Sequence, residues 1–125
     1  MSLKIPVIEK EFLADGAVTD GRIVKPGAAA GDAAHATAAT DKILGVASHD
    51  AADNATVRIM VSGIAKVKAG GTIAAGDLIT AGAAGVAVTA APGAGVNNRI
   101  LGQAIEAAVS GDLFSVLLGQ GSVQG

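Results

Sequence analysis

Only a few side chains of this chain could take part in catalysis, and the strongest candidates are the consecutive residues Ser48, His49 and Asp50. A hydrolytic triad needs a nucleophile, a base and an acid that converge in space. Successive side chains of an extended segment instead point to opposite faces. We therefore interpret this run as a polar turn, and we expect no enzymatic activity.

The spacing of possible metal ligands is no better. His35 and His49 are the two histidines, the chain has no cysteine, and neither histidine has a second one three or four residues along the chain. Asp50, Asp53 and Asn54 resemble part of a calcium loop, but the alternating acidic order and the closing glutamate of such a loop are missing. We expect neither a metal ion nor a cofactor.

Two glycine-rich segments could be mistaken for phosphate-binding loops. Residues 16–22 have Arg22 where such a loop requires lysine, and residues 93–95 lack the third glycine of a dinucleotide-binding turn. Binding of nucleic acid is also disfavoured, because the net charge is −2 and the only aromatic residues are Phe12 and Phe114. No run approaches the roughly 18 apolar residues of a membrane span, and no secretory signal is apparent. We expect no nucleic-acid or membrane partner, and synthesis in the cytoplasm.

The remaining pattern predicts short strands. Residues 43–47 form a compact apolar run, and apolar residues alternate in 56–61 and again in 64–68. Glycines recur every several residues between such runs, which is typical of a sandwich or a barrel. The chain has 125 residues, enough for one domain. Its hydrophobic residues are largely alanine and only 2% of residues are aromatic, so we expect a thin core that gains stability from neighbouring molecules.

An internal repeat is the most informative feature of the sequence. Residues 42–47, Lys-Ile-Leu-Gly-Val-Ala, match residues 99–104, Arg-Ile-Leu-Gly-Gln-Ala, 57 positions later. The same register places the apolar residues of 57–61 over those of 114–118. Two similar halves packed into one pseudo-symmetric β unit explain this match, and chance in an alanine-rich chain is the alternative.

The two ends are expected to differ from the middle. Residues 4–12 mix apolar and charged side chains around Pro6, which indicates an edge strand or an extended arm. We predict an N-terminal arm over 1–15, a β-rich domain over 16–119 and a flexible tail over 120–125. Pairing of the arm with its own domain is the alternative. The predicted fold class is all-β, a small sandwich or barrel-like domain with pseudo-duplicated halves and an extended N-terminal arm.

Several spaced segments together resemble the capsid cement, or head decoration, proteins of tailed phages. They are residues 67–80, 85–87, 100–108, 111–112 and 116–118, with 43–47 similar to the first-half signature of that family. The resemblance covers most of the chain from about Gly16 onward. Gln103 departs from it, because a polar residue stands where the first half has Val46.

The resemblance implies a non-enzymatic protein on the outer surface of the phage head. Such proteins bind the major capsid protein of the expanded shell, often as homotrimers, and hold neighbouring subunits together. Members commonly reach the shell through an N-terminal segment. The candidate capsid-binding residues are therefore Lys4, Ile5, Pro6, Val7, Ile8 and Phe12.

Two other interpretations stay open at this stage. One is a different structural module of the virion, such as a tail-tube or spike-base component. The other is a small β-barrel enzyme or ligand carrier, which a pocket lined by a polar cluster would favour.

Overall fold

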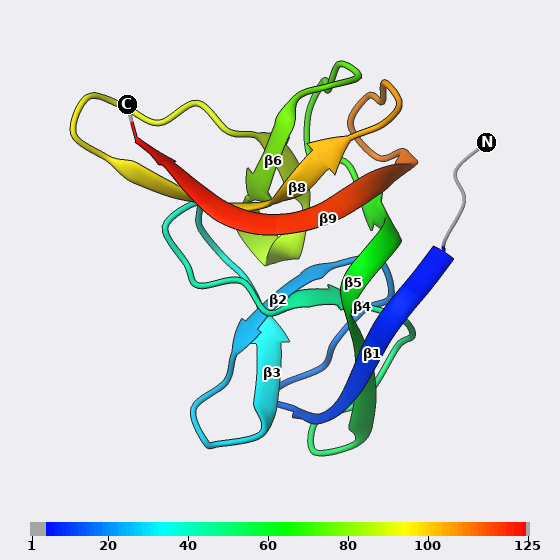
Figure 1. Cartoon of the computed structure of the whole chain (residues 1–125). Helices are drawn as coiled ribbons and strands as arrows, with labels where there is room; N and C mark the ends of the chain where they lie inside the picture. Colours follow the sequence, from blue (N-terminus) through cyan, green and yellow to red (C-terminus); the bar gives the residue numbers. More distant parts are fainter. Residues whose placement is uncertain (1–4, 125) are drawn as a thin grey trace.

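The computed structural model describes residues 5–124, and their regular structure is almost entirely β (Figure 1). This confirms the predicted fold class. One short 3₁₀ turn, η1 (Ala83–Gly85), interrupts the strands. No helix in the described part of the chain has the length and apolar character needed to cross a membrane. The strands are β1 (Ile5–Ala14), β2 (Ile23–Pro26), β3 (Asp32–His35), β4 (Gly45–Ala47), β5 (Thr56–Lys68), β6 (Leu78–Ala81), β7 (Ala87–Thr89), β8 (Asn97–Ala104) and β9 (Leu113–Gln124).

The first half of the chain closes into a five-stranded barrel. The strand order is β1-β3-β2-β4-β5, and β1 pairs with β5 to complete the ring. All pairings are antiparallel except that of β1 with β3. Closing the ring protects backbone groups that an open sheet of such short strands would leave exposed.

The second half repeats this connectivity. The C-terminal part of β5 pairs with β9, and the order continues through β8 and β6 to β7. A parallel bridge between Ala69 and Ala87 joins the two ends of this second ring, as the parallel β1–β3 pairing does in the first. In Figure 1 the two rings lie one above the other, with β1 to β4 below and β6 to β9 above.

The predicted duplication therefore holds at the level of strand register. Val46 pairs with Met60 in the first barrel, and Gln103 pairs with Leu117 at the same place in the second, 57 residues on. Two isolated bridges, Val18 with Ala51 and Ile73 with Ala108, also occupy matching places. Register is not expected to agree across several strands by chance, because a one-residue slip turns every side chain to the opposite face.

The buried residues match in the same way. The first core cluster lies inside the lower barrel, and each of its buried members has a buried counterpart inside the upper one. The lower set is Ala14, Val18, Val24, Ala33, Ala47, Val57 and Ile59. The upper set is Ala69, Ile73, Ile79, Ala87, Ala104, Phe114 and Val116. Both interiors are filled mainly by alanine and β-branched residues, as the composition predicts.

One strand belongs to both barrels. The sequence predicts two strands over 56–61 and 64–68, but the structure has a single continuous strand, β5. Gly63 has a positive φ of 114° within it, a backbone conformation that residues with a Cβ rarely adopt. The strand can therefore bend at Gly63 and pass from the lower barrel to the upper one without ending (Figure 1).

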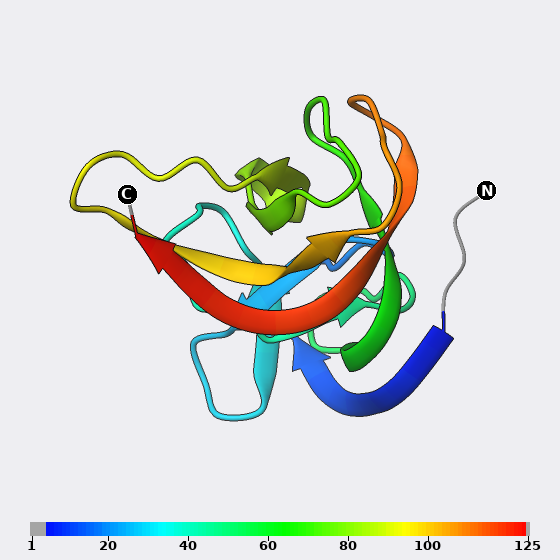
Figure 2. The same cartoon turned by 45° about the horizontal axis from the view of Figure 1, so that its top comes forward.

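Both ends of the described chain belong to the sheet. Residues 5–14, within the predicted arm, form β1 and pair with β5 from Ile5 to Leu13, so the alternative of pairing with the same domain is what the structure shows. Residues 120–124, within the predicted flexible tail, continue β9 and pair with β8. Strands β8 and β9 extend together beyond the upper barrel as a curved two-stranded ribbon (Figure 2). Residues 1–4 and 125 lie outside the described residues.

Two glycines allow strands to cross at close range. A Cβ on Gly45 would lie 2.1 Å from the carbonyl oxygen of Met60, and a Cβ on Gly102 would lie 2.0 Å from that of Leu117. These are the same position in the two halves. The shared Ile-Leu-Gly of the repeat therefore has a steric cause, since no side chain fits where β4 meets β5 or where β8 meets β9.

We expect Gly102→Ala to destabilise the protein. The added methyl would displace the backbone of β9, and overpacking of this kind costs about 1–3 kcal/mol. Gly119→Ala is the control, because no atom lies within 4 Å of its added Cβ. Denaturant unfolding monitored by circular dichroism would measure both free energies. Equal stability of the two variants would contradict the steric explanation.

Candidate functional site

The residues that could form a hydrolytic triad are held by different partners. Ser48 donates a hydrogen bond to the carboxylate of Glu9 on β1. His49 accepts one at Nε2 from the backbone N–H of Arg58, at 3.1 Å. The carboxylate of Asp50 accepts from the backbone N–H of Asp20, at 2.7 Å. The three side chains therefore fasten the β4–β5 connection to neighbouring segments, as expected for a polar turn.

The glycine-containing segment 16–22 cannot cradle a phosphate. A phosphate loop offers free backbone N–H groups to the anion, but here these groups are already bonded within the protein. Gly16 N–H donates to Asp53, Thr19 N–H to His35 Nε2, and Asp20 N–H to Asp50. This arrangement also accounts for Asp50 and Asp53, which act as acceptors for the loop.

Two surface hollows lie on the described part of the chain, and neither brings the catalytic or metal-ligand candidates together. One surface hollow of about 330 Å³ is lined by Ile43, Arg99, Ile100, Gly121 and Ser122. A second, of about 370 Å³, lies against β1 and the β2–β3 connection. Neither is lined by His35 or His49. Within residues 5–124, no three acidic or histidine side chains come together as metal ligands would.

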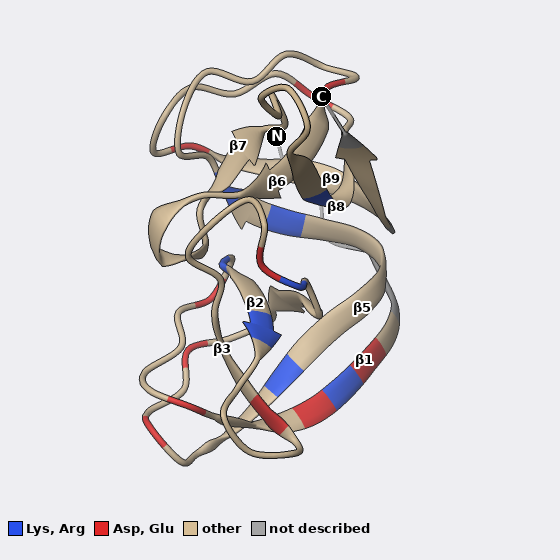
Figure 3. Ribbon diagram, turned by 90° about the vertical axis from the view of Figure 1, so that its left-hand side faces the viewer, with Lys and Arg blue, Asp and Glu red and all other residues tan. Residues whose placement is uncertain are grey.

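The outer strand β1 is the more informative surface. β3 meets it only at Leu13 and Ala14, whereas β5 pairs with it along almost its whole length. Among the described residues, no strand pairs with the other edge of β1 over residues 5–12. Figures 1 and 3 show β1 on the outside of the lower barrel, beside β5. Such an edge can accept a strand from another chain.

Five of the six candidate binding residues lie on this strand. Lys4 lies outside the described residues. Ile5, Pro6 and Val7 form the start of β1. Ile8 exposes 54% of its surface. Phe12 is half-buried against the lower core, with the ammonium group of Lys10 5.7 Å from the centre of its ring. The structure thus brings the described candidates onto one strand, and Ile8 is the one among them whose side chain is known to be exposed.

Comparison with known proteins decides the family. The family model of phage cement proteins matches residues 6–120, which is nearly the whole chain. The chain belongs to the phage cement protein family. It is therefore a structural protein of the phage head and not an enzyme, as the sequence predicts. A search of curated proteins gave no match.

A solved structure shows the same fold. The cement protein is similar to the structure described as head fiber gp8.5 N base in bacteriophage phi29, with a TM-score of 0.71 and 22% sequence identity. The match covers 94% of this chain and 98% of the other. The two-barrel arrangement is therefore found in another phage head protein.

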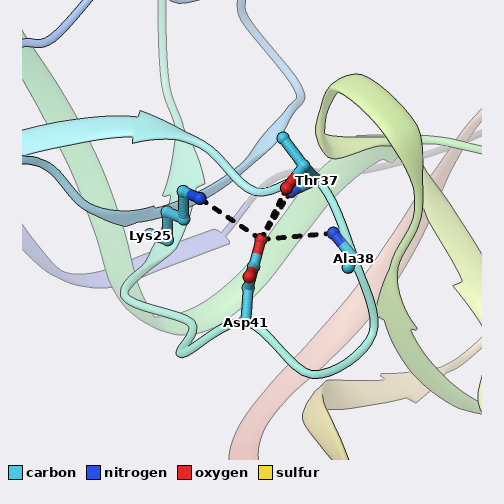
Figure 4. Close-up of polar contacts among 4 residues, drawn as sticks. All are labelled: Lys25, Thr37, Ala38 and Asp41. Carbon is cyan, nitrogen blue, oxygen red and sulfur yellow. Dashed lines mark hydrogen bonds and ion pairs between the residues drawn. The ribbon is translucent and has the colours of Figure 1, made fainter.

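A loop not predicted from the sequence links the two barrels of the cement protein. The backbone carbonyl of Ala39 accepts hydrogen bonds from the Arg99 N–H, at 2.7 Å, and from the Thr80 hydroxyl, at 3.3 Å, both in the upper half. The carboxylate of Asp41 shapes this loop by accepting from the backbone and hydroxyl of Thr37 (Figure 4). An aspartate four residues after a threonine was the available signal.

The charge of Asp41 is favoured by its surroundings. The backbone N–H of Thr37 is the main cause that lowers the pKa of this carboxyl below its ordinary 3.8. Burial, the second-largest effect, opposes it, whereas the Thr37 hydroxyl, the Lys25 ammonium and the Ala38 N–H lower the pKa further. The Lys25 ammonium lies 3.5 Å from the carboxylate (Figure 4). The linking loop is thus built around an ionised side chain.

The surroundings of His35 favour its uncharged form. Burial is the main cause that lowers the pKa of this histidine below 6.5, and the positive charge of Arg22 adds to it. Its Nε2 accepts the Thr19 N–H at 2.9 Å, so the bond requires that nitrogen to be unprotonated. The neutral ring is therefore the form that supports the 16–22 segment.

We expect Asp41→Asn to lower the free energy of unfolding by about 1–2 kcal/mol at pH 7, because hydrogen bonds to a charged acceptor are lost. Since the folded state lowers this pKa, the contribution is present above pH 3.8 and is lost as the pH falls through the lowered value. Denaturant unfolding of both proteins should converge toward low pH. A constant difference between them would contradict this role.

For His35 the stabilising form is the neutral ring, in contrast to the charged carboxylate of Asp41. Because the folded state lowers its pKa, the unfolded chain binds the proton more readily, and the folded state loses stability as the pH falls below 6.5. His35→Gln should unfold with a weaker pH dependence than the wild type between pH 7 and 5. Parallel stability curves for the two proteins over this range would show that His35 does not titrate as described.

Proposed function

We propose that this protein decorates the exterior of the expanded phage head, where it binds the major capsid protein and stabilises contacts between capsid subunits. The single observation that supports this most is the match of nearly the whole chain to the phage cement family. We further propose that the copies on the head surface form homotrimers, as the family resemblance implies. The protein would be made in the host cytoplasm before it joins the head.

The edge of β1 is the proposed capsid contact. Charged side chains at Glu9, Lys10 and Glu11 discourage strand pairing along the later part of this edge, as natural edge strands commonly do. The start of β1, from Ile5 to Ile8, lacks charged residues. A segment of the capsid protein could therefore add a strand there, with backbone hydrogen bonds for affinity and the exposed Ile8 as an apolar anchor.

A core with few large side chains fits a protein that is stabilised by binding to a capsid shell. A small domain with few large side chains gains stability when it binds a partner, by mass action. Repeated sites on an icosahedral shell allow modest contacts to act together when copies are linked. Stabilisation would then be mutual, of the cement protein by the shell and of the shell by the cement protein.

We expect the purified protein to co-sediment with expanded shells that lack it, at saturating stoichiometry. Ile8→Glu should weaken this binding at least about tenfold, because burying a charge at an apolar anchor costs more than about 1.4 kcal/mol. Val109→Glu is the matched control, since Val109 is 57% exposed but lies between β8 and β9. Quantified gel densitometry of the pellets gives the affinities.

Deletion of residues 1–12 is not a suitable test, because it would remove most of β1 and open the lower barrel. Failure of the wild-type protein to co-sediment at micromolar concentration would overturn the proposed function. Binding of Ile8→Glu equal to that of the control would remove the start of β1 from the contact and leave the function in place.

A further inference from the structure

The duplicated halves carry the same row of side chains in two different states. In the lower half, Ile23, Val46 and Met60 pair across β2, β4 and β5, and all three are at most 2% exposed. We call them the covered row. Residues that pair directly across strands share one face of a sheet. This face points out of the lower barrel and toward the upper half, whose core cluster includes it.

The equivalent row of the upper half is open to solvent. Leu78, Gln103 and Leu117 pair across β6, β8 and β9 in the same register. We call them the bare row. Leu78 is 45% exposed, Leu117 is 48% exposed, and Gln103 is exposed as well. Ile64 on β5 pairs with Leu117 and extends the row by one half-buried apolar residue.

A loop of the upper half lies against the start of the covered row, at Ile23. It is the β6–β7 connection over residues 82–86, which contains η1, and we call it the covering loop. A Cβ on Gly85 would lie 2.5 Å from the carbonyl oxygen of Ile23, so the two backbones are in close contact. Arg22 donates a hydrogen bond to the carbonyl of Ala84 at 2.9 Å. Figure 1 shows η1, in yellow-green, above the start of β2.

The lower half has the same loop, which lies beside its own β1, where Gly31 O accepts a hydrogen bond from Leu13 N–H at 2.9 Å. It is the β2–β3 connection over residues 27–31, Gly-Ala-Ala-Ala-Gly, and we call it the bare loop. Gly27 N–H bonds to Asp32 O as Gly82 N–H bonds to Val86 O. Gly31 and Gly85 have similar positive φ angles, 85° and 74°. Unlike Gly85, Gly31 has no neighbouring atom within 4 Å of an added Cβ.

Within the molecule, the covered row of the lower half contacts the covering loop of the upper half. The equivalent surfaces, the bare row of the upper half and the bare loop of the lower half, do not contact each other. We propose that a second copy of this chain occupies the bare row, and that it does so with its bare loop. The contact is head-to-tail, so each added copy again presents a bare row or a bare loop. If the same contact is repeated, the copies form a closed ring when the rotation between neighbours allows it. A ring of three copies would be the proposed homotrimer.

Charged residues stand beside both surfaces. Lys66 pairs with Ser115, two residues from Leu117, but the carboxylate of Glu106 accepts a hydrogen bond from Ser115 N–H at 3.3 Å and Asp77 directly precedes Leu78. The bare loop is flanked by Asp15 and Asp32, and the carboxylate of Asp15 accepts a hydrogen bond from Ala28 N–H. The proposed contact therefore rests on the repeated geometry of the two halves and not on opposite charges.

The contact between copies differs from the internal one in two respects. Gln103 replaces Val46 in the middle of the row, and its side-chain N–H donates to the Gly76 carbonyl, which lowers the cost of covering it. Asp77 stands at the place of Arg22 and cannot donate the hydrogen bond that Arg22 gives to the covering loop. The association between copies is therefore weaker than the internal contact and depends on concentration.

The test uses two variants that each block one side. Leu117→Glu blocks the bare row, and Ala30→Glu blocks the bare loop. Val96→Glu is the control, because Val96 is 41% exposed and lies outside both surfaces. Analytical ultracentrifugation over a concentration series is expected to show oligomers for the wild type and the control, and monomers for each blocked variant alone.

Mixing the two blocked variants gives the decisive result. Each retains the side that the other has lost, so an equimolar mixture should form dimers and nothing larger. Thermal unfolding of each variant confirms that it is folded before it is mixed. A wild type that stays monomeric at the highest concentration, a blocked variant that still associates, or a mixture without dimers would each overturn the proposal.

The proposal deepens the self-association in the proposed function, but it does not depend on binding to the shell. Co-sedimentation of the same variants with expanded shells separates the two. Monomeric variants that bind shells more weakly through lost avidity agree with both proposals. If Leu117→Glu abolished shell binding while its self-association stayed normal, the bare row would belong to the capsid contact, and the present inference would fail.

Discussion

The architecture depends on one strand that two barrels share. β5 pairs with β1 and β4 along its first part and with β9 along its last part, so each ring is closed only through it. Gly63 lets β5 bend between the two barrels. Gly45 lets β4 approach the backbone of β5 closely, and Gly102 lets β8 approach the backbone of β9 in the same way. Because both rings are closed through β5, a change that disrupts this strand is expected to affect both halves.

The sequence predicted the parts of the fold that repeat or alternate. Val57 and Ile59 alternate with exposed positions and form part of the lower core, and the 57-residue match of residues 42–47 with 99–104 marks the same strand crossing in both halves. Alternation is a local property, and the repeat is visible as identity, so both can be read from the chain alone.

Other features could not be read in this way, because they depend on pairing between distant segments. Residues 5–14 resemble an arm, since Pro6 and the charges at 9–11 are typical of an edge, and only the pairing with β5 places them in the barrel. Met60 and Leu117 are matched apolar residues in sequence, yet one is buried and the other half-exposed. The difference in exposure between Met60 and Leu117 depends on how the two halves pack together, which cannot be deduced from a local sequence pattern. The described candidate binding residues share one strand, but the proposal that they contact the shell comes from the family resemblance.

The order of the strands along the chain has a consequence for synthesis. The lower ring needs only residues up to the end of β5, whereas the upper ring needs β9, the last strand of the described chain. During translation the lower barrel can close while the later strands are still in the ribosome. It would then present the free edge of β5 as a preformed template on which the second half is laid down, and the long-range pairings that slow the folding of β proteins would be divided into two successive steps.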